Sequence, residues 1–132
     1  MPANRTPIYP NQPACVAVNV PVSSTADVTL FTADATYGSI ITSINCYENA
    51  APGANNHLFW IKISSVKYNI ARVAMQNTAN AVANLLTATN FKMVDNSRPK
   101  ILLPPGASLG ITPSASVAGT YDYYIEAAHF LP

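Results

Sequence analysis

The amino-acid sequence predicts an all-β protein, and three observations support this fold class. Short segments rich in branched and aromatic residues alternate apolar with polar side chains, as strands with one buried face do. Clusters of Gly, Pro and Asn separate these segments at intervals typical of an all-β sandwich or barrel. A length of 132 residues suits a single domain with its own core. We therefore expect about eight strands in one domain formed by residues 14–132.

In the first half of the chain, alternation also predicts which face of each strand is buried. Val28 and Leu30 share one face of their strand, and Ile40, Ile44 and Cys46 share one face of the next. The expected strands of this half are residues 15–20, 26–32, 40–47, 58–64 and 66–75, with a turn at 37–38 and a loop at 51–56.

The fourth of these strands has the clearest pattern. Phe59, Ile61 and Ile63 are expected to point inward, which puts Trp60 on the opposite face. The strand that follows is expected to bend near Asn69.

The second half of the chain begins with an ambiguous stretch, residues 76–89. Val82, Leu85 and Leu86 have helical spacing, but the many Asn and Thr residues suit a loop, so a loop with one short helix stays open. Beyond it we expect extended segments at residues 91–94, 100–103, 109–112 and 121–130, with a turn at 104–106. The two faces of the last strand are Tyr123, Ile125 and Ala127 against Asp122, Tyr124 and Glu126.

Charge is scarce in this chain, and that limits what it can bind. Seven Lys and Arg and six Asp and Glu residues are present, so 10% of the chain is charged while 49% is hydrophobic. Soluble domains typically have about 25% charged residues. A surface so poor in charge favours contact with other protein, and we expect a homo-oligomer. The net charge of +1 argues against nucleic acid as a partner, and no apolar run is long enough to span a membrane.

No group of residues indicates catalysis, a cofactor or a metal site. His57 and His129 are far apart, lack a partner at ligand spacing and are expected to be ordinary surface or edge histidines. The carboxylates are scattered, and neither a Gly-rich phosphate loop nor a Gly-x-Ser-x-Gly motif occurs. Cys15 and Cys46 lie in strand-like runs, which predicts buried free thiols and leaves a disulfide between them open. We therefore expect a protein that is not an enzyme.

Residues 1–13 are expected to form an extended N-terminal arm outside the core. They contain four prolines and no periodic apolar pattern, and proline favours extended backbone with few hydrogen bonds. A frayed terminus is the simple alternative. Ile8 and Tyr9 favour the arm, because two large apolar side chains on a tail need a surface to dock on.

Aromatic side chains are the candidate contact residues of the domain. Tyr47, Trp60 and Tyr124 all lie on strand faces opposite the expected core. Outward Tyr and Trp are typical of protein interfaces and of platforms that stack on sugars, although loops of the same chain can also cover them. Of these three readings we favour contacts between protomers.

Three segments resemble small structural proteins of tailed bacteriophages. Residues 4–10 (NRTPIYP) are similar to the Asn-Lys-Thr-Pro-Ile-Tyr-Pro opening of that family. Residues 30–39 (LFTADATYGS) resemble its Val-Phe-Thr-Ala-Asp-Ala-Thr-Asn-Gly-Ser turn, and residues 103–109 (LPPGASL) its Leu-Pro-Pro-Gly-Tyr-x-Leu turn. The order and approximate spacing cover nearly the whole chain, while residues 66–90 and the C-terminal end depart from the pattern.

The resemblance implies a head decoration (cement or auxiliary capsid) protein with a jelly-roll-like antiparallel β-sandwich. Such proteins decorate the outer surface of a capsid, often as trimers, and bridge neighbouring subunits of the major capsid protein. The expected location is the virion, after assembly in the host cytoplasm. Ile8 and Tyr9 would contact the capsid, and Tyr47, Trp60 and Tyr124 would join protomers. A head-fibre or tail-associated module that binds a receptor or glycan is the alternative.

Overall fold

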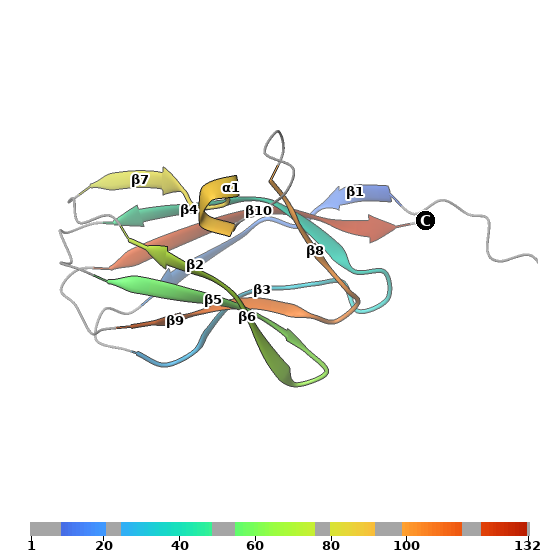
Figure 1. The fold of residues 1–132 in the computed structure, drawn as a ribbon. Coiled ribbons are helices and arrows are strands. Elements are labelled where there is room, and N and C mark those ends of the chain that lie inside the picture. Colours follow the sequence, from blue (N-terminus) through green and yellow to red (C-terminus); the bar gives the residue numbers. More distant parts are fainter. Residues whose placement is uncertain are drawn as a thin grey trace, which may run out of the picture.

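The computed structural model describes residues 9–20, 25–48, 55–75, 80–91, 99–114 and 120–131, and these form two packed β-sheets. Figure 1 shows the sheets as two layers, with the short helix α1 (Ala88–Phe91) at one side. All pairings between the described strands are antiparallel. The predicted all-β sandwich is therefore confirmed.

The first layer, sheet A, contains six of the described strands. Its long central strands, β10 and β4, pair over most of their length. β1 and β2 lie one after the other along the far side of β10, and β8 and β7 do the same along β4. The bounds are β1 Tyr9–Pro13, β2 Val16–Val20, β4 Ser39–Glu48, β7 Ala81–Asn84, β8 Ile101–Leu103 and β10 Tyr121–Leu131.

The second layer, sheet B, has the order β3-β9-β5-β6 among the described residues. β1 and β2 together fill one strand position of sheet A, and β7 and β8 together fill another. The described strands therefore occupy eight positions in the sandwich. The chain passes repeatedly between the layers in the manner of a jelly roll, which confirms the predicted fold class. The bounds are β3 Val28–Thr32, β5 Asn56–Ile63, β6 Val66–Ala74 and β9 Ser108–Pro113.

The core lies between the sheets and is built from the inward side chains of alternating strands. On β10, Tyr123 and Ile125 are buried while Tyr124 is exposed, as the sequence predicts. Full burial of a large apolar side chain contributes roughly 1.5–3 kcal/mol, so the central strands carry much of the stability. Apolar side chains with 0% exposure are Val20, Ile41, Ile44, Phe59, Leu109, Ile111 and Ile125.

Two register shifts move side chains away from their expected positions. The pairing of β4 with β10 shifts by one residue after Ser43. Ile41 therefore reaches the core, and the expected inward position of Ile40 is wrong, since it is only half-buried. A shift in β6 leaves Ile70 out of the pairing beside Asn69, where the bend is predicted. Strict alternation cannot anticipate such bulges, because one inserted residue reverses the faces beyond it.

Part of the ambiguous stretch forms a strand. Val82 lies in β7 and is exposed, while Leu85 and Leu86 are buried directly after it. The helix forms later, over α1, so the helical spacing of these three residues is misleading. Phe91 was expected in an extended segment, but it ends the helix, and residues 92–94 lie outside the described residues.

The two predicted glycine turns are confirmed and lie against each other. Gly38 and Gly106 have φ of 82° and 74°, which glycine adopts without steric penalty. The N–H groups of both donate to the carbonyl oxygen of Asp34, at 3.2 and 3.0 Å. The Asp34 carboxylate accepts the N–H groups of Tyr37 and Thr36, which lowers the pKa of Asp34. Two of the segments that resemble phage proteins therefore meet in space.

Part of the predicted arm pairs with sheet A. β1 lies along the end of β10, with Tyr9 opposite Leu131 and Pro13 opposite Ala128. Ile8 lies outside the described residues, and for Tyr9 only the backbone is described.

Candidate interaction surfaces

The outer face of sheet A brings together two of the three aromatic residues expected at an interface. In the ladder of β10 with β4, Tyr124 lies opposite Asn45 and Asp122 lies opposite Tyr47. Tyr47 and Tyr124 therefore occupy neighbouring rows of one face. β7 extends this face, because Val82 lies opposite Tyr47. The name tyrosine face is used below for Tyr47, Val82, Asp122, Tyr124 and Glu126.

The tyrosine face is exposed, partly apolar and acidic. Val82 is 66% exposed and Tyr124 is 46% exposed, and both carboxylates of the face are exposed as well. Tyr47 is half-buried, and its hydroxyl donates to Asn80 Oδ1 at 2.6 Å. A hydrogen bond with the neighbouring Cys15 thiol raises the pKa of Tyr124. Because this bond holds the phenol proton, the Tyr124 hydroxyl donates to the thiol, and its oxygen can accept from a partner.

Trp60 lies on the outer face of sheet B, but it is only 1% exposed. Its ring packs on Gly110, where a Cβ atom would overlap the indole. The Nζ atoms of Lys62 and Lys67 lie 5.2 and 5.9 Å from the ring centroid. The expected exposure of Trp60 is therefore wrong, because its own protomer covers the ring.

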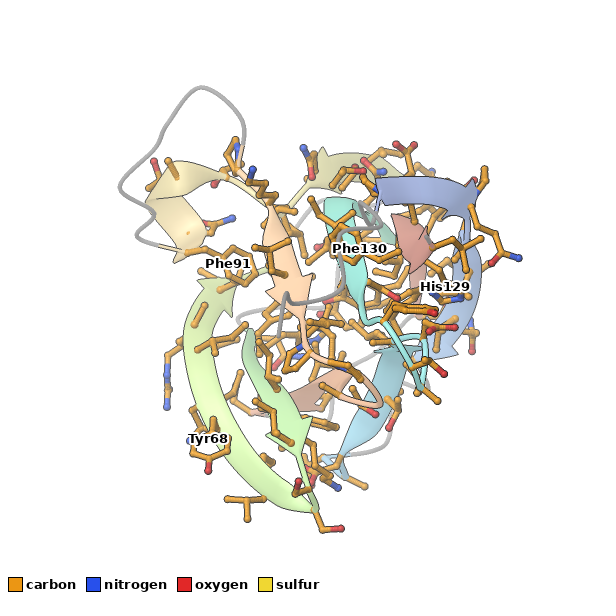
Figure 2. All side chains as sticks on the ribbon, turned by 90° about the vertical axis from the view of Figure 1, so that its right-hand side faces the viewer. Tyr68, Phe91, His129 and Phe130 are labelled. Atoms are coloured by element: carbon orange, nitrogen blue, oxygen red, sulfur yellow. The ribbon has the colours of Figure 1, made fainter. Side chains whose placement is uncertain are left out.

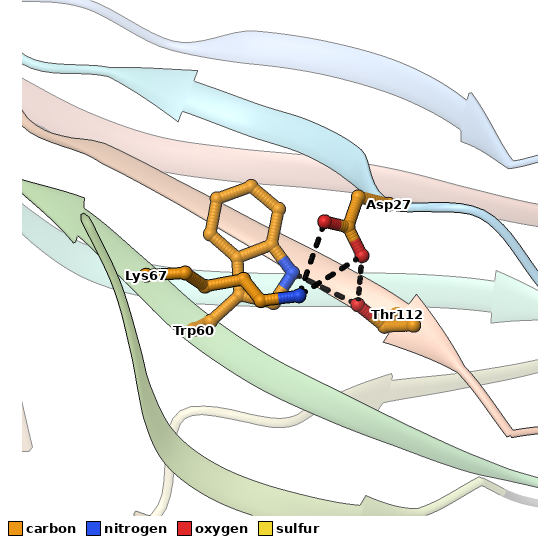
Figure 3. A network of polar contacts seen from close by, with 4 residues as sticks. All are labelled: Asp27, Trp60, Lys67 and Thr112. Carbon is orange, nitrogen blue, oxygen red and sulfur yellow. Dashed lines mark hydrogen bonds and ion pairs between the residues drawn. The ribbon is translucent and has the colours of Figure 1, made fainter. Parts of the chain in front are cut away.

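A polar network holds the edge of this indole (Figure 3). The Trp60 N–H donates to Thr112 Oγ1 at 3.1 Å, and the Thr112 hydroxyl donates to Asp27. Lys67 Nζ forms an ion pair with Asp27 at 3.1 Å. The hydrogen bonds from Thr112 and Lys67 lower the pKa of Asp27. Trp60, Thr112 and Lys67 lie on β5, β9 and β6, and Asp27 directly precedes β3, so the network links three strands of sheet B to the start of the fourth.

A second exposed apolar surface lies at the end of the β5–β6 hairpin. Ile63, Val66 and Tyr68, the hairpin tip, are 37%, 51% and 53% exposed. Ile63 lies opposite Val66, and Tyr68 lies opposite Ile61, so the tip continues the core-facing side of sheet B. Figure 1 shows the hairpin leaving the sandwich, and Figure 2 shows Tyr68 at the periphery. Ile63 is thus on the predicted face, but sheet A does not cover it. Alternation alone gives no signal for this, because it reports the face and not the extent of the opposite layer.

The two open sides of the sandwich differ. Beside β6, the helix α1 covers the gap, and the ring of Phe91 packs 5.2 Å from that of Phe59. Between β2 and β3 the layers border a groove of about 480 Å³, the lateral groove. Residues that line it include Val16, Val18, Leu30, Phe31, Thr32 and His129.

The expectation of surface or edge histidines is wrong for His57, which is 0% exposed. Its Nδ1 is hydrogen-bonded to the Tyr123 hydroxyl at 2.6 Å. Burial lowers the pKa of His57 to about 4, so the ring is neutral at pH 7. His129 is half-buried, with its Nδ1 hydrogen-bonded to Ser39 Oγ at 2.6 Å.

Both cysteines are free thiols, but they differ in exposure. Cys46 is buried, as predicted, and burial raises its pKa to about 12, which makes the thiol unreactive. The expected burial of Cys15 is wrong, since it is exposed between β1 and β2.

The described residues contain no group of three or more His, Cys, Asp or Glu side chains placed to hold a metal ion. In the same part of the chain, none of the helices has the length and apolar character needed to cross a membrane. The tyrosine face and the hairpin tip offer noncovalent contact through aromatic and branched side chains.

No protein-family model and no curated protein matches the sequence. Solved structures match the fold. A chain from the capsid of Ralstonia phage GP4 has a TM-score of 0.55 and 9% identity, and the match covers 99% of this chain and 91% of that one. A chain of the Bacillus endospore appendages, which are disulfide-linked pili, has a TM-score of 0.54 and 8% identity, with 95% and 89% covered. The protein therefore shares its fold with components of a phage capsid and of a pilus.

Proposed function

We propose that this protein is a non-enzymatic virion protein that decorates the outer surface of a phage capsid and stabilises it by bridging capsid subunits. The observation that carries the proposal is the tyrosine face, an exposed aromatic and apolar surface on a chain with 10% charged residues. The likeness in fold to a capsid chain of Ralstonia phage GP4 supports it, as does the resemblance of residues 4–10 to the opening of tailed-phage proteins.

Stabilisation in this proposal comes from burial of surface. A decorating protein binds the assembled shell and not the free subunits, so its binding free energy favours the shell. Repetition over a symmetric surface raises a modest affinity through avidity. The major capsid protein is the proposed partner, and trimers are the favoured oligomer. Tyr47 and Tyr124 contact a neighbouring subunit, and the segment that ends in Ile8 and Tyr9 docks on the shell.

Particle binding by shortened and substituted chains tests this proposal. Removal of residues 1–8 leaves β1 in place, so the domain is expected to fold and to bind capsids with lower occupancy. Tyr124→Ala is expected to lower occupancy as well. The matched control is Tyr37→Ala, because Tyr37 is 36% exposed and lies outside the tyrosine face. Occupancy is measured by cryo-electron microscopy of capsids to which the purified chain is added back.

Full occupancy by both altered chains would contradict the proposed contacts. Location of the wild-type chain on a head fibre or tail and not on the capsid surface, together with glycan binding that Tyr124→Ala abolishes, would favour the receptor-binding alternative.

A further inference from the structure

The two edges of sheet B lie on opposite sides of the molecule. Among the described strands, the order β3-β9-β5-β6 leaves β3 and β6 with one neighbour each. Because successive neighbours are antiparallel, β3 and β6 run in opposite directions. A second copy beside the first can therefore continue the sheet, with its β6 antiparallel to β3.

β6 is the edge best suited to such an addition. It is nine residues long and has no proline, and residues 66–69 are all exposed. The edge strands of sheet A are all shorter than β6: β1 has five residues, two of them prolines, β2 has five, β7 has four and β8 has three. A long exposed edge with apolar side chains is a template for pairing with another chain.

The lateral groove beside β3 offers a place for the apolar side chains of an added strand. Leu30 and Phe31 line the groove from β3, and Val16 and Val18 line it from β2. A strand added to β3 points every second side chain toward the space between the layers. Val66 and Tyr68 suit this position, because they lie on the core-facing side of their own sheet. Figure 2 shows Tyr68 and His129, which lines the groove, on opposite sides of the molecule.

The charges near the two edges differ in sign. β6 carries Lys67 and Arg72, whereas Asp27 directly precedes β3 and Asp34 follows it. Lys67 is paired with Asp27 of its own chain, and Arg72 is exposed. Opposite charges across a strand pair are favourable and like charges are unfavourable. Because Lys67 and Asp27 neutralise each other within each copy, the charges that bear on the contact are Arg72 on β6 and Asp34 after β3, and these favour contact of β6 with β3 over contact of two β6 strands.

We propose that copies of this protein join head to tail, with the hairpin tip of one copy in the lateral groove of the next. The proposal rests on the proposed function, since it names a second contact between protomers on the shell, beside that of the tyrosine face. The occupant of the groove is Val66 and Tyr68 of a second copy. Such a contact is heterologous, so it closes into a ring, such as a trimer, if the rotation fits and otherwise stays open.

Cross-linking of two chains, each with one exposed cysteine, tests the geometry. Both chains carry Cys15→Ser to remove the exposed native thiol, and the buried Cys46 stays in place. One chain adds Thr32→Cys in the groove, and the other adds Asn69→Cys beside Tyr68, which leaves the proposed contact residues intact. Thr32 and Asn69 are exposed, so both chains are expected to fold. With a short bis-maleimide, a covalent dimer is expected in the mixture and in neither chain alone. A dimer of the Asn69→Cys chain with itself, or no dimer in the mixture, overturns the proposal.

Self-association in solution provides the second test. Tyr68→Lys is expected to weaken self-association by roughly tenfold or more, measured by sedimentation velocity. Leu102→Lys is the matched control, because Leu102 is 60% exposed and lies on neither surface. Equal association of Tyr68→Lys and wild type overturns the proposal.

The failures of the two proposals are distinguishable. A wild-type chain that occupies particles but stays monomeric in solution and on the shell overturns the head-to-tail contact and leaves the decoration role intact. A chain that associates through Tyr68 but never occupies particles overturns the decoration role and leaves the contact intact.

Discussion

Trp60 and Tyr124 both lie on outer faces of the sandwich, yet the first is 1% exposed and the second 46%. On sheet B, Gly110 leaves space beneath the indole, and Lys62 and Lys67 extend over it. Lysine stems often cover apolar surface in this way while the charged ends stay in water.

On sheet A, the cross-strand neighbours of Tyr124 are Ala17 and Asn45, which are too short to cover a phenol ring. Exposure of an outward aromatic residue therefore depends on the size of its neighbours on adjacent strands. The covered residue stabilises its own sheet, and the uncovered one is available to a partner.

Alanine substitution of the two aromatic residues has the largest expected effect on this comparison. Trp60→Ala is expected to lower the free energy of unfolding by about 4 kcal/mol, because it empties the space above Gly110 and leaves Thr112 without its indole donor. Tyr124→Ala is expected to change it by less than about 1 kcal/mol. Urea unfolding followed by far-ultraviolet circular dichroism measures both. Equal losses would show that the two faces do not differ in this way.

Substitution of Gly110 tests the packing of Trp60 from β9, the neighbouring strand. A Cβ atom there overlaps the indole of Trp60 and the carbonyl oxygen of Val28, so Gly110→Ala is expected to cost about 3 kcal/mol. Gly106→Ala is the control, since no atom lies within 4 Å of its Cβ and only its φ of 74° is unfavourable. Thermal unfolding compares them, and a smaller loss for Gly110→Ala than for Gly106→Ala would contradict the close packing.

An acid titration tests a third aromatic ring, that of His57, which is buried and can take up a proton. The pKa of His57 falls from 6.5 to about 4 on folding, so between these values the unfolded chain binds a proton that the folded chain excludes. Stability is therefore lost as the pH falls from 6.5 toward 4, by about 2 kcal/mol at pH 5. Urea unfolding at pH 8 and pH 5 measures the loss. His57→Phe should lose less stability over this interval, and identical losses would be evidence against the effect.

Removal of the Lys67 charge has the smallest expected effect. The ion pair of Lys67 with Asp27 is partly exposed, so Lys67→Met is expected to lower stability by less than about 1 kcal/mol. The methionine stem still covers part of the Trp60 ring. The difference should shrink at high salt in urea titrations. A loss as large as that of Trp60→Ala would assign the stability of this face to charge and not to packing.

Much of the fold was predictable because its signals are local. The alternation of Tyr123, Tyr124 and Ile125 places each on the correct face, since successive side chains of a strand point in opposite directions. The turns at Gly38 and Gly106 follow from the conformational freedom of glycine. The misplacement of Ile40 comes from a register shift, which depends on a partner strand more than 80 residues away.

The contact surfaces were less predictable because exposure is not a local property. Tyr47 and Tyr124 share a face only because β10 and β4 pair in one register. His57 offers no sequence signal of burial, since a histidine beside a loop is usually exposed, and here its ring lies between the sheets against Tyr121 and Tyr123. The hairpin tip has the pattern of a core strand and is exposed only because sheet A ends before it.

By itself, the sequence determined the all-β class, the faces of most strands and the scarcity of charge. These follow from short-range periodicity, turn chemistry and composition. Only the tertiary structure decided which outward aromatic residue is covered, which histidine is buried and where core-facing side chains reach water. The physical reason is that burial depends on neighbours that strand pairing brings together. Gly110 lies beneath Trp60 only because β9 pairs with β5, and the two residues are far apart in the sequence.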